Sequence, residues 1–206
     1  MDIAVAKKIM GRNFIGPDEL NAISSQLSIA RVLKSPKIPF SAQTLKKYRA
    51  SAVLILGVPK FKSGKNVTIN NMRNRFGMNP KKQPCFYNQD WYLKERFASQ
   101  ALGAQWHLVS ASIKSATRGK EPSRIKGRKL FPSAILAAFT FFAYYLHTKG
   151  GTLWKHDFIW CSDTDGNGDQ IYVGRYCDWK AKSKKGFNIH RHLRIRANYG
   201  AAPEIV

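Results

Sequence analysis

Two largely apolar stretches stand out in the pattern of hydrophobic and polar residues. Residues 52–58 (AVLILGV) form a short run followed by a Pro, which is typical of a strand buried on both faces at the centre of a sheet. Residues 130–147 form a longer run with Pro132 near its start and Gly150 and Gly151 beyond its end, which are helix start and stop signals. Because this run also contains Ser, Thr, Tyr and His, we expect a buried core helix over 132–147 and not a membrane span.

The remaining periodicity predicts helices mainly in the first half of the chain and strands mainly in the second. Pro17 and the two acidic residues after it form a good first helical turn, and apolar residues follow at helical spacing as far as Ile29. Short apolar or alternating segments bounded by turn-forming residues indicate strands. The expected elements are helices over 17–29, 41–50, 67–76 and 89–98 and strands over 106–113, 157–161, 170–176 and 187–195.

This order of elements predicts an α+β fold. Its expected parts are a helical N-terminal part (1–50), a strongly basic α/β part with the buried central strand (51–130), and the core helix packed on a largely antiparallel C-terminal sheet (131–206). No internal repeat and no long Gly/Ser or Pro linker divides the sequence. We therefore expect one domain over 1–206.

The charge is strongly unbalanced. The 206 residues include 35 Lys and Arg against 12 Asp and Glu, which gives a net charge of +23 at pH 7. A compact chain with this excess repels itself unless it meets a polyanion, so we expect nucleic acid as the partner, and no membrane. The first residues lack the order of a secretory signal, and the three cysteines contain no Cys-x-x-Cys motif. We expect a cytoplasmic protein with reduced thiols.

Positive charge gathers in three places. Residues 114–129 (KSATRGKEPSRIKGRK) interleave basic residues with Gly, Ser, Thr and Pro, and such a loop can follow a phosphate backbone. A second cluster spans 60–82 and a third spans 191–196; the alternative for each is a solvated surface without a specific partner. The expected nucleic-acid contacts are Lys60, Lys62, Lys65, Arg73, Arg75, Lys81, Lys82, Lys114, Arg118, Lys120, Arg124, Lys126, Arg128, Lys129, Arg191, Arg194 and Arg196.

One acidic segment interrupts this basic background. Asp163, Asp165, Asn167 and Asp169 place oxygen-bearing side chains at alternate positions with a Gly at the sixth, as in the first half of a calcium-binding loop. The second half differs, because Gly174 stands where such a loop has a bidentate Glu. Since the segment lies between two predicted strands, a plain hairpin turn is the alternative to a divalent-metal site.

A second acidic pattern overlaps the first. Asp157, followed after a predicted strand by Asp178 and Lys180, resembles the Asp...Asp/Glu-x-Lys core of the restriction-type nuclease superfamily. The resemblance implies that the two carboxylates hold Mg²⁺ or Mn²⁺ and that the lysine positions or activates water. A metal site of this kind beside a basic surface would suit phosphodiester cleavage.

Two histidines provide a third candidate site. His190 and His192 flank Arg191, and alternation along a strand would place both imidazoles on the same face. With Cys161 and Cys177 they could form a zinc site, and with Asp157 or His156 they could form a more open, catalytic metal site. The alternative is a basic strand whose arginines contact phosphates and whose histidines have no special role.

These observations give three functional hypotheses. The first is a nucleic-acid-binding protein without its own chemistry and without a required cofactor, such as an accessory factor of a mobile element, a defence system or a ribonucleoprotein. The second is a small metal-dependent nuclease or nickase that uses residues within 157–192 and Mg²⁺ or Mn²⁺, with Zn²⁺ or Ca²⁺ as the other ions considered. The third is a structural or inhibitory protein that docks on an acidic protein or ribonucleoprotein surface.

Overall fold

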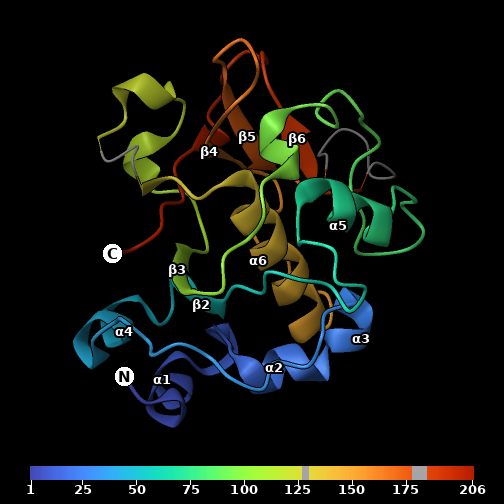
Figure 1. Ribbon diagram of the computed structural model, residues 1–206. Helices are drawn as coiled ribbons and strands as arrows, with labels where there is room; N and C mark the ends of the chain where they lie inside the picture. The colour runs from blue at the N-terminus through green and yellow to red at the C-terminus, as the bar shows by residue number, and fades with distance from the viewer. Residues whose placement is uncertain (127–129, 178–184) are drawn as a thin grey trace.

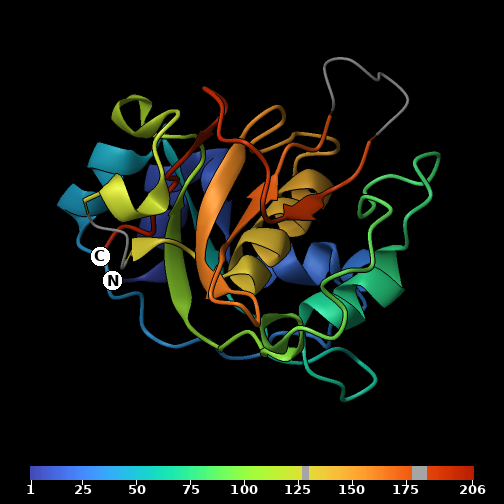
Figure 2. The same ribbon diagram turned by 90° about the horizontal axis from the view of Figure 1, so that it is seen from above.

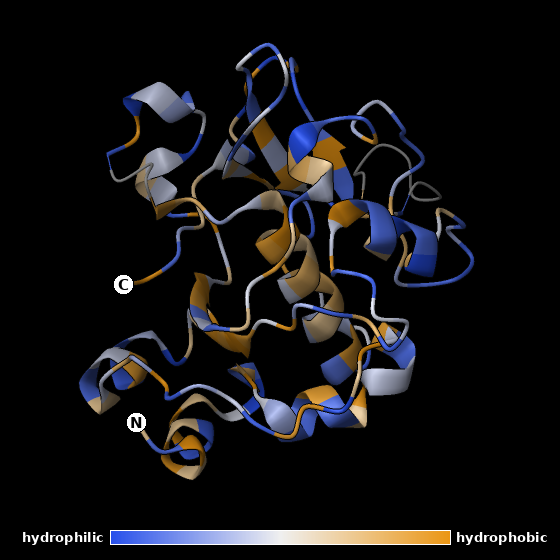
Figure 3. Cartoon of the chain, viewed as in Figure 1, coloured by the Kyte–Doolittle hydropathy of each residue, from blue (hydrophilic) through white to orange (hydrophobic). Residues whose placement is uncertain are grey.

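Helix α6 (Ala134–His147) passes through the middle of the molecule in the computed structural model, which describes residues 1–126, 130–177 and 185–206 (Figures 1 and 2). Its residues from Ala134 to Ala143 are all buried, and it contacts strands of both sheets as well as three helices. A helix that is apolar on all sides belongs inside a protein, and Figure 3 shows hydrophobic residues along α6. The expected core helix is therefore confirmed. Within the described residues, no helix combines the length and the apolar character that a membrane span needs.

The other elements surround α6, and together they confirm the α+β class. The helices are α1 (Ile3–Met10), α2 (Pro17–Ala22), α3 (Ser24–Leu27), α4 (Ala42–Tyr48) and α5 (Ile69–Phe76). The strands are β1 (Phe14–Ile15), β2 (Ala52–Leu56), β3 (Trp106–Ser110), β4 (Phe158–Thr164), β5 (Gln170–Gly174), β6 (Asn188–His190) and β7 (Tyr199–Gly200).

Strand β2 is the centre of the first sheet, as its apolar sequence predicts. It pairs with β1 in parallel and with β3 in antiparallel orientation, and all five of its residues are buried. The helices that flank this sheet in sequence begin where local side chains cap them. The Ser41 hydroxyl accepts a hydrogen bond from the Thr44 N–H at the start of α4, and Thr68 does the same for the Asn71 N–H at the start of α5.

The C-terminal sheet has the order β6-β5-β4-β7 and is largely antiparallel, with β7 alone parallel to its neighbour β4. Side chains alternate between its two faces. One face, which includes Ile159 and Val173, joins the main core around α6. The other face is aromatic and forms a second, smaller cluster of buried side chains: Ile125, Phe131, Phe158, Trp160, Tyr172, Tyr199 and Ala201. Both faces of this sheet are therefore covered.

Three expectations for the elements are wrong. Residues 89–98 form turns and a short 3-10 helix at Arg96–Ser99, because long-range bonds such as Trp91 Nε1 to the Ile189 carbonyl, 3.1 Å, override the local helical spacing. The last long strand ends at His190 and does not continue to 195. The expected helix over 17–29 is divided into α2 and α3, because the chain turns at Ile23 between them. Helix α1 lies in the N-terminal part that was expected to be helical, although no separate helix was assigned there; the Asp2 carboxylate caps it by accepting from the Ala4 and Val5 N–H groups.

The core around α6 supplies a stability prediction. Phe142 is fully buried and its ring lies 4.2 Å from the Phe76 ring and 4.8 Å from the Phe86 ring, measured between centroids. The Phe142→Ala substitution should lower the free energy of unfolding by about 3–5 kcal/mol in urea titrations, because it leaves a cavity among these rings. Val5→Ala, at a side chain that is 48% exposed in α1, should change it by less than about 0.5 kcal/mol. A similar loss in both variants would contradict this account of the core.

Candidate functional site

Residues 114–126, called the basic cover below, lie over the aromatic face of the C-terminal sheet. The side chain of Ile125, in this segment, belongs to the smaller cluster of buried side chains on that face, which we call the aromatic cluster. The Gly119 N–H donates to the Tyr199 carbonyl at 2.9 Å, and the Trp160 indole N–H donates to the Lys120 carbonyl at 3.2 Å. Thr117 adds a third anchor, since its hydroxyl accepts from the Ala201 N–H at 2.9 Å. The basic segment expected to be an adaptable loop is therefore held in place by the sheet that it covers.

A shallow groove runs between the basic cover and the segment that follows β6. Its volume is about 250 Å³, and its floor includes the buried rings of Trp160 and Tyr172. Leu193 is 39% exposed in the groove, and its N–H donates to the Tyr172 hydroxyl at 2.7 Å, which fixes the wall opposite the cover. The lining residues are Glu121, Pro122, Ser123, Trp160, Asp169, Gln170, Tyr172, His192, Leu193 and Ile195.

Exposed cations lie in the two segments that form the walls of the groove, next to the residues that line it. They belong to the basic cover on one side and to the segment 194–196 on the other, and we call them together the groove face. They are Lys114, Lys120, Arg124, Lys126, Arg194 and Arg196. Arg124 has an acidic neighbour, Glu121, at 3.7 Å, but both side chains are largely exposed. Arg128 and Lys129, also expected as contacts, lie outside the described residues.

Arg118 and Asp157 have a different role from the one expected for each. The Arg118 guanidinium donates to both carboxylate oxygens of Asp157 at 2.9 Å, in a bidentate pair. Arg118 also donates to the Ala197 carbonyl at 3.2 Å. The hydrogen bond and charge of Asp157 raise the pKa of the Arg118 side chain above its ordinary value. This pair ties the basic cover to the sheet, so Arg118 is not a free phosphate contact and Asp157 is not an open metal ligand.

The second basic cluster lies on the other side of the molecule. Figures 1 and 2 both show α5 and the loop after it on the opposite side of α6 from the basic cover. The expected contacts there that are exposed are Lys60, Lys62, Lys65, Arg75, Lys81 and Lys82. Arg73, in contrast, is half-buried near Met78 and the Tyr92 ring. Arg75 is exposed but also donates to the Ser25 carbonyl at 3.2 Å. The two clusters therefore do not form one continuous binding surface.

The acidic segment between β4 and β5 is a hairpin connection, which was the alternative to a calcium-type loop. Asp163 points away from it, because its carboxylate accepts the Ala134 N–H at the start of α6 at 2.6 Å. Burial raises the pKa of Asp163, although this hydrogen bond opposes the shift. Asn167 donates its backbone N–H to Asp165 Oδ1 at 2.9 Å, and its side chain is exposed. The four residues expected to share a metal are therefore not arranged around one point.

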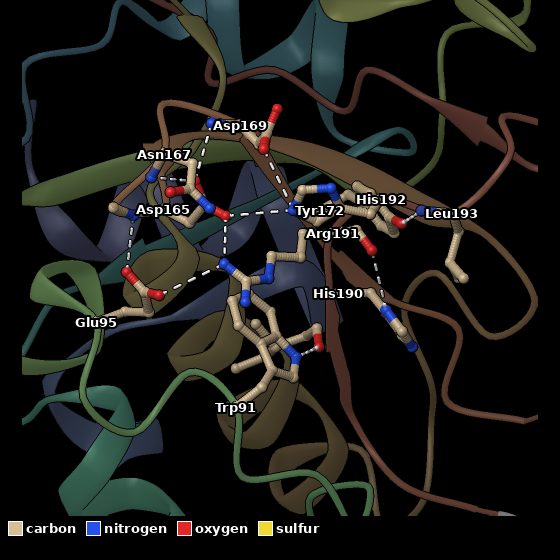
Figure 4. A network of polar contacts seen from close by, with 12 residues as sticks. Trp91, Glu95, Asp165, Asn167, Asp169, Tyr172, His190, Arg191, His192 and Leu193 are labelled. Carbon is tan, nitrogen blue, oxygen red and sulfur yellow. Dashed lines mark hydrogen bonds and ion pairs between the residues drawn. The ribbon is translucent and has the colours of Figure 1, made fainter.

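Asp165 is the centre of a polar network at the end of the groove (Figure 4). Its Oδ1 accepts the N–H groups of Asn167 and Asp169, both at 2.9 Å, and its Oδ2 lies 2.5 Å from Arg191 Nη1. Burial would raise the pKa of Asp165, but the hydrogen bonds from Arg191 and from the backbone outweigh burial, so the pKa is lowered. His192 Nε2 also faces Asp165 Oδ2, at 3.5 Å.

Arg191 supports this network and is not a free phosphate contact, contrary to expectation. Its guanidinium lies over the Trp91 ring, 4.4 Å from the centroid, and its Nη1 is 3.6 Å from Glu95 Oε1. Glu95 in turn accepts the Gly166 N–H at 2.9 Å. Arg191 therefore joins the hairpin turn to the segment around Trp91 and Glu95.

The expectation that His190 and His192 share a face is wrong. Strand β6 ends at His190, and His192 has a φ of 61°, so the backbone turns between them. His190 is half-buried against the Tyr172 ring and contacts the Gln89 amide nitrogen at 2.7 Å through Nε2. Burial lowers the pKa of His190. His192 points instead toward Asp165 and toward Asp169.

The cysteines do not join the histidines in a zinc site. Cys161 is fully buried in the main core, and burial raises the pKa of its thiol well above the ordinary value. Within the described residues, the group of three side chains whose metal-ligating atoms all lie within 4.8 Å of one another is Asp165, Asp169 and His192. Asp178 and Lys180 of the expected nuclease pattern lie outside the described residues.

Several residues of the site gave no usable signal in the sequence. Trp91 and Glu95 are about a hundred positions away from Arg191 along the chain, and no motif connects them. The same is true of a buried pair elsewhere, in which His107 Nδ1 lies 2.7 Å from Glu204 Oε2. Such pairs arise from the topology of the sheets, which brings distant segments side by side.

Comparison of the chain with family models, curated proteins and solved structures returned no match. The functional argument therefore starts from the site. Its components are a shallow groove with a partly apolar lining, exposed cations on both sides, and a carboxylate–imidazole cluster at one end. The cations can bind anionic groups, and the cluster can bind a cation or hold a proton.

The Asp165 network supplies a prediction about stability and pH. Because folding lowers the pKa of Asp165, its carboxylate contributes stability above its ordinary pKa and loses that contribution as the pH falls through the lowered value. Asp165→Asn keeps an oxygen for the turn but loses the charge opposite Arg191. We expect it to lower the free energy of unfolding by about 1–3 kcal/mol at neutral pH, and the difference from the wild type should shrink below about pH 4.

Urea unfolding at a series of pH values measures this difference. Asp169→Asn is the matched control, because the Asp169 side chain is 50% exposed and its pair with His192 should contribute at most about 1 kcal/mol. An Asp165→Asn variant as stable as the wild type at neutral pH would mean that the Arg191–Asp165 pair does not hold the turn.

Proposed function

We propose that this protein binds nucleic acid through contacts between the groove face and the phosphate backbone. The observation that carries the proposal is that exposed cations lie in both of the segments that form the walls of one groove, in a chain with a net charge of +23. Cations that release counterions from phosphates are the main source of sequence-independent affinity for nucleic acid. Because the basic cover is bonded to the sheet, its backbone loses little freedom on binding.

The pairing of acidic residues supports the same proposal. Several carboxylates are already engaged with a neighbouring cation or imidazole, including Asp157 with Arg118, Asp165 with Arg191, and Glu19 with Lys7. The carboxylate of each pair is buried or half-buried. The remaining positive charge is therefore displayed toward solvent, where an anionic partner can reach it.

The shape of the groove favours a single strand over a duplex. The exposed Leu193 and half-buried Ile195 give the groove an apolar surface between its cations. An unpaired base can place its ring on such a surface while the flanking phosphates meet Lys and Arg side chains. A duplex can offer only its phosphates to this surface. Its base edges lie inside the grooves of the double helix, and a shallow concave surface does not enter those grooves.

Two triple variants test the location of the interface. Lys120→Ala/Arg124→Ala/Lys126→Ala removes three charges from the groove face, and Lys60→Ala/Lys62→Ala/Lys65→Ala removes three from the opposite side of the molecule. Fluorescence anisotropy with labelled single strands and duplexes of one length, over a salt series in EDTA, gives the affinity and its salt dependence. The groove-face variant should bind more weakly and lose about two units of the slope of log K against log salt, and the opposite-side variant should lose less of both.

Equal losses in the two variants would contradict the groove face as the interface and would favour general attraction by the net charge. Weak binding by the wild type that does not increase with strand length would contradict the proposal as a whole. It would favour docking on an acidic protein surface, the third hypothesis from the sequence. Tighter binding of the duplex than of the single strand would contradict the role given to the apolar lining.

A further inference from the structure

Three potential metal ligands converge at the end of the groove. His192 Nε2 lies 3.2 Å from Asp169 Oδ2 and 3.5 Å from Asp165 Oδ2, and all three ligand atoms lie within 4.8 Å of one another. Two of the residues come from the β4–β5 hairpin turn and the third from the segment after β6 (Figure 4). The cluster therefore connects the hairpin turn to the segment after β6, and the Arg191–Asp165 pair holds the same two segments together.

We propose that Asp165, Asp169 and His192 bind one divalent transition-metal ion. Ligands about 2.1 Å from a tetrahedral ion are separated from each other by about 3.4 Å, and the two distances to His192 Nε2 lie close to this value. One imidazole with two carboxylates is a donor set that suits Zn²⁺ or Mn²⁺ better than Ca²⁺, which prefers oxygen ligands alone.

The local charge favours a cation at this point despite the basic character of the chain. Glu95, Asp165 and Asp169 bring three negative charges, and Arg191 balances one of them. The Arg191 contact leaves room for a second partner on the same oxygen, because a carboxylate oxygen has two lone pairs and the His192 side is a separate direction in Figure 4. Arg191 then acts as a partner outside the ligand set that orients Asp165.

The site is open on the side of the groove. Asp169 and His192 both line the groove, and their side chains are 50% and 52% exposed, whereas the Asp165 side chain is fully buried. With three protein ligands, an ion keeps at least one coordination position for water or for another oxygen. Resting here on the proposed function, we infer that a phosphate oxygen of the bound strand takes that position, so that the ion and the strand bind cooperatively.

Titration of the untagged protein with metal alone tests the ion site. Zn²⁺ is followed by calorimetry and Mn²⁺ by the loss of the free-ion signal in electron paramagnetic resonance. The wild type should bind one ion, and both Asp169→Asn and His192→Gln should weaken binding by about tenfold or more. Because both side chains are half exposed, these variants should fold normally, which circular dichroism checks. Asp18→Asn, at an acid of α2 whose side chain is 84% exposed, is the matched control and should bind as the wild type does.

Absence of binding at concentrations up to about millimolar, or equal affinity in the wild type and His192→Gln, would overturn the ion site. The coupling is tested separately by strand binding in Mn²⁺ and in EDTA. Mn²⁺ should tighten strand binding by the wild type, because coupling between two ligands is reciprocal. Strand binding by Asp169→Asn should not respond to Mn²⁺, because this variant lacks one of the ion ligands. If the wild type binds the strand in EDTA but gains nothing from Mn²⁺, the phosphate bridge is wrong while the proposed function stands. If it binds Mn²⁺ but no strand, the proposed function fails and the ion site stands.

Discussion

The need to cover both faces of the C-terminal sheet determines much of this structure. Strands β4 and β5 carry apolar residues at successive positions, so alternation sends large side chains to both sides. Helix α6 covers one side, and the basic cover together with the segment after β6 covers the other. A highly charged segment can serve as a cover because its backbone bonds to the sheet while its long side chains extend into solvent.

This constraint connects the core to the candidate site. The basic cover packs on the aromatic cluster through Ile125, and Trp160 and Tyr172 of the same cluster form the floor of the groove. The Arg118–Asp157 and Arg191–Asp165 pairs connect the two walls to the rest of the fold, and the other cations of the groove face remain exposed. Rigid placement of binding groups reduces the conformational entropy that is lost on binding.

The sequence predicted the parts of the fold that depend on continuous hydrophobic pattern. The core helix and the central strand β2 were located within about two residues, because their apolar runs leave few alternatives. Residues 89–98 were misassigned, because their conformation is set by contacts with distant segments such as the Trp91 bond to Ile189. In the site, Asp165, Asp169 and His192 were recognised as candidate ligands, but their separation from Asp163 and His190 was not. That separation depends on a turn at His192 and on the capping of α6, which residue spacing does not encode.

We propose that nucleic acid binds at the groove face, and hydrogen–deuterium exchange with and without a single-stranded oligonucleotide locates the binding surface. Exchange measures how strongly the backbone N–H groups of each segment are protected, and it needs no substitution in the protein. We predict that the oligonucleotide slows exchange in the basic cover and in residues 191–196, with little change around α5 on the opposite side. Protection confined to residues 60–82, with none in the basic cover, would contradict the account.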